Sequence, residues 1–205
     1  MTRAVSSATS IAVRTPPSDL QMPKPLHRYV AFMRALNVGG RIVKMDHLRK
    51  LFEELGFQDV ATYIASGNVI FQSPETDAAK LEKTINGHLE KALGYVVGTY
   101  IRTPAELAAI AAHRPFPAEE LDDPGHTLYI NFLPEAPSPD AVARLMELRN
   151  EVDDFAVHGR EMYWLARKRI SESTVTGAKL AKALGMQMTN RNLNTVRKLA
   201  EKYAG

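Results

Sequence analysis

The sequence contains no cysteine. Disulfides, thiolate nucleophiles, iron–sulfur clusters and cysteine-ligated zinc sites are therefore excluded. The absence fits a reducing compartment, and we expect a cytoplasmic protein. No apolar run approaches the roughly 20 residues that a bilayer span needs, so we expect no membrane insertion.

Catalytic and metal-binding signatures are also missing. The chain has no His-Glu-x-x-His motif and no Gly-x-Ser-x-Gly nucleophile elbow. Its six histidines show no metal-ligand spacing, so we expect neither a metal nor a cofactor. In each of two acidic pairs, Asp122-Asp123 and Asp153-Asp154, the neighbouring side chains would point to opposite sides of a strand. We interpret both pairs as parts of solvated loops.

The composition is that of an ordinary folded protein. The 205 residues are 45% hydrophobic and 24% charged, which suits one domain or two small packed subdomains. The net charge is only +3, but residues 117–162 hold 11 acids against 3 bases, and residues 163–205 hold 9 bases against 2 acids. This segregation indicates either a basic surface for an anionic partner or two solvated faces that pack together.

Residues 1–27 differ from the rest of the chain. Ser, Thr, Pro and Arg dominate, Asp19 is the only acid, and four prolines preclude a regular helix. We interpret the segment as a disordered leader. The alternatives are an organelle transit peptide and an upstream start codon with initiation at Met22.

Hydrophobic periodicity predicts an α+β protein with two halves. Residues 28–102 read as strand, helix, strand, strand, helix, strand, the ferredoxin-like βαββαβ arrangement. Two amphipathic helices would cover one sheet face, leaving the other to be solvated, to cover a ligand or to meet the second half. The predicted strands are 28–36, 60–64, 69–71 and 95–101, and the helices run from Met45 to Gly56 and from Asp77 to Gly94.

Residues 103–205 are predicted to form a smaller α+β subdomain that ends in two helices, with 28–205 as one compact unit. A capping box, Thr103-Pro-Ala-Glu106, opens its first helix. A strand over 127–133 and a helix from Ser138 precede a hairpin at His158-Gly159-Arg160. The last helices are predicted over 175–184 and 190–203. The similar order of elements in the two halves is consistent with a diverged duplication.

Three segments are rich in hydrogen-bond donors. In the first, Arg34–Gly40, the glycines let backbone amides converge as an anion nest, or they only make a tight turn. It lacks the Walker and Gly-x-Gly-x-x-Gly spacings. The second, Ser66-Gly67-Asn68, is either an ordinary hairpin turn or a source of ligand contacts.

The third segment, Thr189–Thr195, holds more polar side chains than a helix start requires. We expect a positive helix terminus here, with Arg191 able to bind a phosphate or carboxylate bidentately. The candidate ligand-binding residues of the three segments are Arg34, Asn37, Gly39, Gly40, Lys44, Ser66, Asn68, Thr189, Arg191, Asn192, Asn194 and Thr195.

These segments resemble a bacterial family of unknown function, DUF1697. The resemblance rests on Arg34-Ala-Leu-Asn-Val-Gly-Gly40, on Thr62-Tyr-Ile-Ala-Ser-Gly-Asn-Val69, and on Thr189-Asn-Arg-Asn-Leu-Asn-Thr-Val196. It covers residues 28–203 and implies a ferredoxin-like first half, but no established activity. Two positions depart from the family pattern, because Ala35 stands where glycine is usual and Leu193 where an aromatic residue is usual.

We therefore predict that the three segments converge on an anionic small molecule or, with weaker support, on a nucleic acid. Tyr129, Phe132, Tyr163 and Trp164 would then be a base-stacking platform or, as we favour, core residues. One alternative is a phosphoryl- or acyl-transfer enzyme that uses the same groups, with His47 or Glu53 as its base. Another is a protein–protein interaction module that pairs through the open sheet face. The oligomeric state is not predicted.

Overall fold

The first half of the chain forms an antiparallel four-stranded sheet with two helices. In the computed structural model, which describes residues 24–37, 39–64 and 67–203, its strand order is β2-β3-β1-β4. In the central strand β1, Ala31 lies opposite Val69 on one side and Ile101 on the other. The elements are β1 His27–Arg34, α1 Met45–Glu53, β2 Gln58–Tyr63, β3 Asn68–Ser73, α2 Ala78–Leu93 and β4 Gly98–Arg102.

The second half forms another antiparallel four-stranded sheet, in the order β6-β7-β5-β8. From β5 to β8 its elements alternate as they do from β1 to β4, so the two sheets have the same connectivity. The elements are α3 Pro104–Ala112, α4 Ala118–Leu121, β5 Thr127–Phe132, α5 Pro139–Met146, β6 Asp153–His158, β7 Glu161–Ala166, a 3₁₀ turn Ile170–Glu172, α6 Gly177–Leu184, β8 Thr189–Asn192 and α7 Leu193–Tyr203.

The helix starts predicted from capping residues are confirmed. The Asp77 side chain accepts a hydrogen bond from the backbone amide of Lys80 at the start of α2. At α3, Thr103 and Glu106 form both hydrogen bonds of the predicted capping box. Such caps satisfy backbone amides that have no partner inside the helix, and they set where each helix begins.

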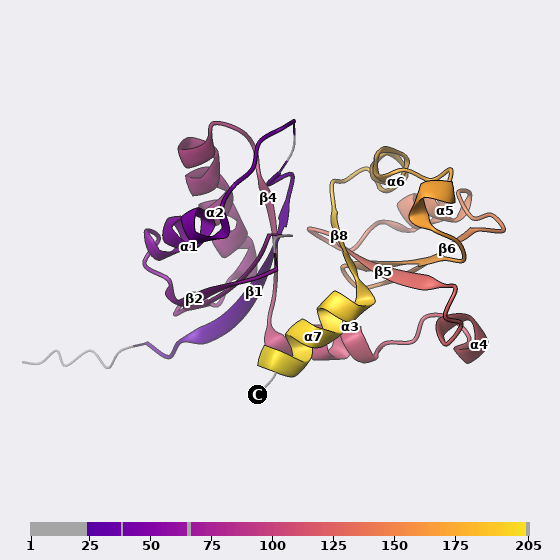
Figure 1. Cartoon of the computed structure of the whole chain (residues 1–205), viewed down its shortest axis with the longest axis horizontal. Helices are drawn as coiled ribbons and strands as arrows, with labels where there is room; N and C mark the ends of the chain where they lie inside the picture. The colour runs from indigo at the N-terminus through magenta and orange to yellow at the C-terminus, as the bar shows by residue number, and fades with distance from the viewer. Residues whose placement is uncertain (1–23, 38, 65–66, 204–205) are drawn as a thin grey trace, which may run out of the picture.

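The two sheets pack face to face. The face of the first sheet that α1 and α2 leave uncovered meets the second sheet, where the rings of Phe32 and Phe132 stack with centroids 4.0 Å apart. Figure 1 shows α1 and α2 on the outer side of the first sheet, α5 and α6 beyond the second, and α3 and α7 together along one edge. The helices and sheets therefore bury apolar surface on both sides of each sheet.

This packing bears on two alternatives from the sequence, the interaction module with an open sheet face and the base-stacking platform. The sheet face that an interaction module would have used is not open, because Val30, Phe32 and Ile70 are at most 2% exposed. The aromatic residues also form no exposed platform. Phe132 and Tyr163 belong to the core between the sheets, whereas Trp164 belongs to the core beneath α5 and α6.

Two predictions for the second half are wrong. Asp153 and Asp154 are not in a solvated loop but in β6, where they are 0% and 8% exposed. Asp153 accepts hydrogen bonds from the Trp164 indole and the Ser173 hydroxyl, both at 2.8 Å. The last helix begins at Leu193 rather than at residue 190, because Thr189–Asn192 pairs with β5 as the edge strand β8. No described helix is long and apolar enough to cross a membrane.

Candidate functional site

Arg191 lies in the interior, between the two halves. It is 8% exposed, and its Nε donates to Asn68 Oδ1 at 2.6 Å. Its Nη1 donates to Thr189 Oγ1 at 2.9 Å and to the Asn190 carbonyl at 2.6 Å. Its Nη2 donates to the carbonyls of Met33 at 3.1 Å and Gly67 at 3.3 Å. The five N–H groups of the guanidinium thus all have acceptors within the protein.

This network joins the second and third predicted segments to each other and to Met33, the residue before the first segment. The Thr189 hydroxyl also donates to the Met33 carbonyl at 3.1 Å, and the Met33 amide donates to the Gly67 carbonyl at 2.8 Å. Asn68, 0% exposed, adds a hydrogen bond from its amide nitrogen to the Tyr63 carbonyl at 3.0 Å. The second and third segments therefore meet through contacts with each other, and Leu36 of the first segment lies beside Gly67. Ser66 lies outside the described residues.

The burial of Arg191 has an electrostatic consequence. Loss of hydration lowers the pKa of Arg191 to about 10, because a desolvated guanidinium loses stabilisation of its charged form. At neutral pH the group still carries its charge. Arg191 extends from strand β8, not from a helix terminus. We conclude that this residue holds the two halves together.

Gly67 packs closely against Met33 and Leu36. Its φ is +70°, and a Cβ at this position would stand 2.9 Å from Met33 Cβ and 3.1 Å from Leu36 Cδ2. We expect Gly67→Ala to destabilise the protein by about 2–4 kcal/mol, through left-handed strain and overpacking. Urea unfolding measures the change.

Gly56→Ala is the matched control for the Gly67 substitution. Gly56 has a similar φ of +79°, but a Cβ added there would meet no described atom within 4 Å. We expect a loss of only about 1 kcal/mol, from the left-handed backbone alone. Equal losses at the two glycines would contradict the close contact at Gly67.

Hydrogen bonds within the protein hold the loop after β1. The Asn37 side chain accepts from the Val43 amide at 2.9 Å, and the Tyr95 hydroxyl donates to the Leu36 carbonyl at 2.7 Å. Gly39 and Gly40 have φ values of +62° and +78°, are exposed, and border open space. Their positions fit the tight-turn interpretation. Ala35 has a φ of +60°, so a glycine would be less strained there.

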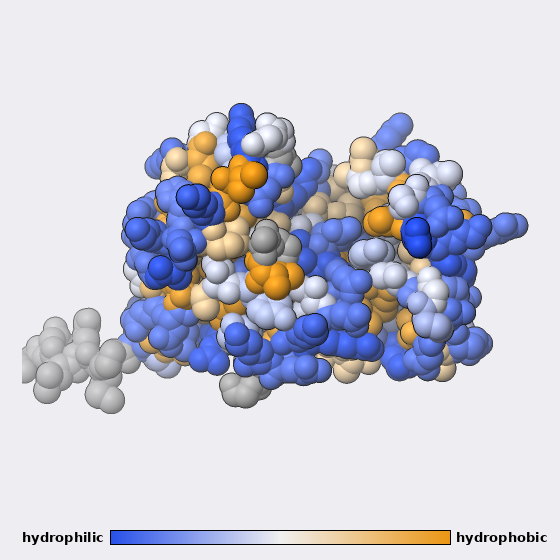
Figure 2. Space-filling model, viewed as in Figure 1, coloured by the Kyte–Doolittle hydropathy of each residue, from blue (hydrophilic) through white to orange (hydrophobic). Residues whose placement is uncertain are grey.

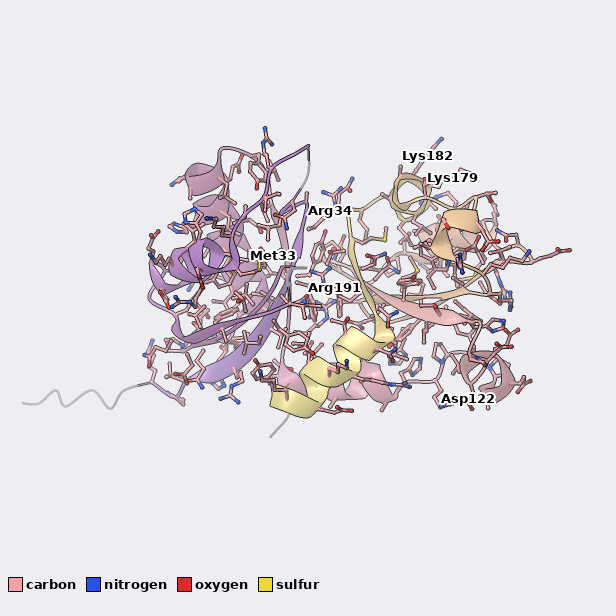
Figure 3. All side chains as sticks on the ribbon, in the orientation of Figure 1. Met33, Arg34, Asp122, Lys179, Lys182 and Arg191 are labelled. Atoms are coloured by element: carbon pink, nitrogen blue, oxygen red, sulfur yellow. The ribbon has the colours of Figure 1, made fainter. Side chains whose placement is uncertain are left out.

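Arg34 stands apart from the other candidate residues. It ends β1, is partly exposed, and lines a cleft of about 410 Å³ between the first half and α6. Its side chain forms no hydrogen bond or ion pair with a described residue. The outline in Figure 2 dips between the halves, and Figure 3 shows Arg34 above Arg191 in that space, with Lys182 on α6 across from it.

The lining of the cleft is part polar and part apolar. The polar residues include Asn131, Gln187, Thr189 and Asn190. The apolar residues include Trp164 and Leu180, which are at most 3% exposed. A second hollow shares Arg34, Gly177, Ala181 and Gln187 with the cleft and continues along α6 to Lys182.

The first turn of α6 supplies backbone donors to the same cleft. Thr176 caps the helix by accepting from the Lys179 amide. The amides of Gly177 and Ala178 belong to the first turn, where a helix leaves its N–H groups without internal partners. Both residues line the hollows beside Arg34. Backbone N–H groups and a guanidinium together can bind an anionic group.

The charges of the cleft have one sign. Among the described residues that line the two connected hollows are two cations, Arg34 and Lys182, and no carboxylate or histidine. The suggested bases lie elsewhere: His47 lines a hollow with Arg41 and Lys44, and Glu53 pairs with Arg49 on α1 at 2.6 Å. The described lining offers an attraction for anions but no general base.

The remaining candidate residues do not reach this cleft. Lys44 precedes α1 on the exposed surface beside His47. Asn192 and Asn194 line a different hollow with Asp122 and Arg197, where Asn192 accepts from the Asn194 amide at 2.8 Å. Thr195 lies in the first turn of α7. Leu193 is partly buried and packs against the core between the sheets. The aromatic residue that the family usually has at this position would therefore contact this core.

Sequence reasoning missed most of the cleft. Thr176 and Gly177 carry a helix-start signal, a threonine cap before a short amphipathic helix, but nothing in the sequence places them opposite Arg34. Asn131 and Gln187 are isolated polar residues without a motif. Asn131 reaches the cleft through the pairing of β5 with β8, and Gln187 lies two residues before β8, so both placements depend on long-range contacts.

Comparisons with known proteins give a family and a fold. A family model described as protein of unknown function (DUF1697) matches residues 26–163, so it does not include the Thr189–Thr195 segment. A conserved bacterial protein, SP0830 from Streptococcus pneumoniae, has a similar structure: the TM-score is 0.69 at 22% identity, over 88% of this chain and 100% of that one. No curated protein matches the chain.

Proposed function

The chain belongs to the DUF1697 family, and from the geometry of its cleft we propose that it binds a small organic anion between Arg34 and the first turn of α6. The observation that carries the proposal is the guanidinium of Arg34, which lines a polar cleft without a hydrogen-bond or ion-pair partner among the described residues. Arg34 belongs to the predicted set of site residues. Thr189 is the other predicted residue that lines the cleft, whereas the proposed site adds α6 and leaves out Arg191.

The lining, part polar and part apolar, favours a ligand that carries a phosphate or carboxylate on an apolar body. Arg34 can bind either group bidentately, and the amides of Gly177 and Ala178 can add to it. The apolar part of the lining, which includes Trp164, would take the body of the ligand. The volume of about 410 Å³ falls within the range of roughly 300–1,000 Å³ for small-molecule pockets.

Nucleic acid is the second candidate ligand, supported by Arg34, Lys182 and the basic C-terminal segment. Its affinity would fall steeply with salt, in proportion to the phosphates that are neutralised. A phosphoryl- or acyl-transfer enzyme has less support, since the described lining supplies no general base. We favour the small anion because buried residues, Trp164 and Leu180 among them, line the cleft.

The two halves of the chain have the same strand order. We propose that residues 28–102 and 103–205 are two subdomains of one compact unit, each with a ferredoxin-like core. The strand orders β2-β3-β1-β4 and β6-β7-β5-β8, with antiparallel pairing throughout, support this assignment. The cleft would then lie between two related subdomains, a common place for ligands.

Arg34→Gln tests the proposed site. Wild-type protein is expected to bind at least one of inorganic pyrophosphate, adenosine monophosphate and citrate in isothermal titration at low salt. In the variant we expect affinity for that probe to fall roughly 10- to 100-fold, since a charge-assisted bidentate contact contributes about 1.5–3 kcal/mol. Because Arg34 is partly exposed and forms no hydrogen bond or ion pair with a described residue, the melting temperature is expected to change little.

Arg28→Gln is the matched control. Arg28 lies on the same strand and is also partly exposed, but it lies six residues away and lines neither of the two hollows. The control is expected to bind the probe as the wild type does. Equal weakening in both variants would indicate a general charge effect, and unchanged affinity in Arg34→Gln would refute the proposed site.

A further inference from the structure

A second pocket lies between α3 and the hairpin that joins β6 to β7. Its volume is about 320 Å³, and it shares no lining residue with the Arg34 cleft. The walls come from Glu106, Ile110 and His113 on one side and from His158, Arg160 and Tyr163 on the other. The pocket is thus framed by two elements of the second half that are far apart in the sequence.

Tyr163 is the unusual residue of this pocket. The residue is 0% exposed, and its hydroxyl is buried without a hydrogen-bond partner among the described residues. A buried, unpaired hydroxyl lowers stability, and phenylalanine would fill the same space without that cost. Burial, with the nearby Glu161 carboxylate, raises the pKa of Tyr163, so the hydroxyl keeps its proton and remains a donor.

Three rings meet at this pocket. The imidazoles of His113 and His158 stack with centroids 4.5 Å apart and planes at 23°, and the Tyr163 ring lies 5.0 Å from that of His113. Burial, and secondarily the charge of His158, lowers the pKa of His113, so this ring is neutral at pH 7. The neutral imidazole of His113 favours a flat ligand that can pack against a ring.

The charged residues of the pocket are already paired. Glu106 accepts from Arg160 at 3.1 Å and from the backbone amide of Thr103 at 2.7 Å. Glu161 accepts from Nε of the buried Arg102 at 2.6 Å. Since each carboxylate has a guanidinium beside it, the pocket presents little net charge to a ligand. It therefore differs in chemistry from the Arg34 cleft.

We propose that this pocket binds an uncharged, planar heteroaromatic molecule of one or two rings, whose carbonyl oxygen or ring nitrogen accepts a hydrogen bond from the Tyr163 hydroxyl. The ring of the ligand packs against the imidazole of His113, and Ile110 contributes the apolar wall. The size of the pocket limits the ligand to about this class, because it is near the lower bound of roughly 300 Å³ for small-molecule sites.

Nicotinamide is a suitable probe, with cyclohexanecarboxamide as a non-planar control of similar size and polarity. Amide chemical shifts of the full chain are followed as each compound is added up to tens of millimolar. We expect saturable shifts at His113, His158 and Tyr163 with nicotinamide only. In Tyr163→Phe the affinity for nicotinamide is expected to fall roughly threefold to tenfold, the effect of one hydrogen bond.

Tyr163→Phe also keeps the test independent of folding, because it is expected to melt at the same temperature as the wild type or higher. Tyr129→Phe, on the neighbouring strand β5 but outside the pocket, is expected to bind as the wild type does. The proposal is overturned by equal binding of both amides, by unchanged affinity in Tyr163→Phe, by the absence of saturable shifts, or by a crystal structure with nicotinamide in which only water contacts the hydroxyl.

Discussion

Arg191→Met is expected to destabilise the protein by about 3–5 kcal/mol, because hydrogen bonds from charged donors contribute roughly 1.5–3 kcal/mol each and five of them are lost. Their acceptors lie on β1, on the Gly67 turn, on β3 and on β8 itself, so the substitution loosens the contact between the halves. A typical domain has only about 5–15 kcal/mol of stability, and part of the protein is therefore expected to unfold at 37 °C. Urea unfolding followed by circular dichroism measures the loss.

Arg197→Met is the control for Arg191→Met. Arg197 lies on the exposed side of α7, close in sequence, and its removal is expected to change stability by less than about 0.5 kcal/mol. A loss below about 1 kcal/mol in Arg191→Met would contradict a structural role. Such a result would return Arg191 to the set of candidate ligand residues.

Arg102→Met is expected to have an effect of similar size, about 3–5 kcal/mol, since removal of one partner leaves a buried charge without compensation. Arg102 is 1% exposed and donates to Glu161 at 2.6 Å, to the Ile101 carbonyl at 2.8 Å, and to the Leu133 and Arg160 carbonyls at 3.1 Å. It thus connects β4 of the first sheet to β7 of the second. Thermal and urea unfolding both report the loss.

The double variant Arg102→Met/Glu161→Gln separates the charge from the packing. Neutralising Glu161 removes the uncompensated carboxylate, so we expect the double variant to be more stable than Arg102→Met alone by about 1–2 kcal/mol. If the loss of stability in the double variant equalled the sum of the losses in Arg102→Met and Glu161→Gln, the two residues would not be coupled. This account of the pair would then be wrong.

Much of the fold could be predicted because its signals are local. Asp77, Thr103 and Ser138 each cap a helix near where the sequence places it, and the helix spacing of apolar residues identifies the buried faces. Strand β8 was missed because four polar residues, Thr189–Asn192, resemble a helix cap locally. Their alternating burial comes from pairing with β5, which the local pattern does not contain.

The candidate site was harder to predict for the same reason. The density of donors at Asn68 and Arg191 indicated correctly that these segments meet, but such donors can satisfy one another as well as a ligand. Burial decides whether a guanidinium donates its hydrogen bonds within the protein or stays accessible to a ligand. Arg191 is buried, whereas Arg34 is partly exposed. The acidic pair Asp153-Asp154 shows the same limit, because its partners Trp164, Ser173 and Arg149 come from other segments.

The most direct test is to locate the bound anion by amide, indole and arginine Nε chemical shifts, during a titration with whichever of pyrophosphate, adenosine monophosphate and citrate binds in the calorimetric experiment. We predict saturable shifts at Gly177 and Ala178, at the indole of Trp164, which is the single tryptophan of the chain, and at Arg34 Nε. Residues of the Asn192–Asn194 hollow and Lys44 are expected to remain unchanged. Shifts confined to those residues, or no saturable shifts, would contradict a binding site between Arg34 and α6.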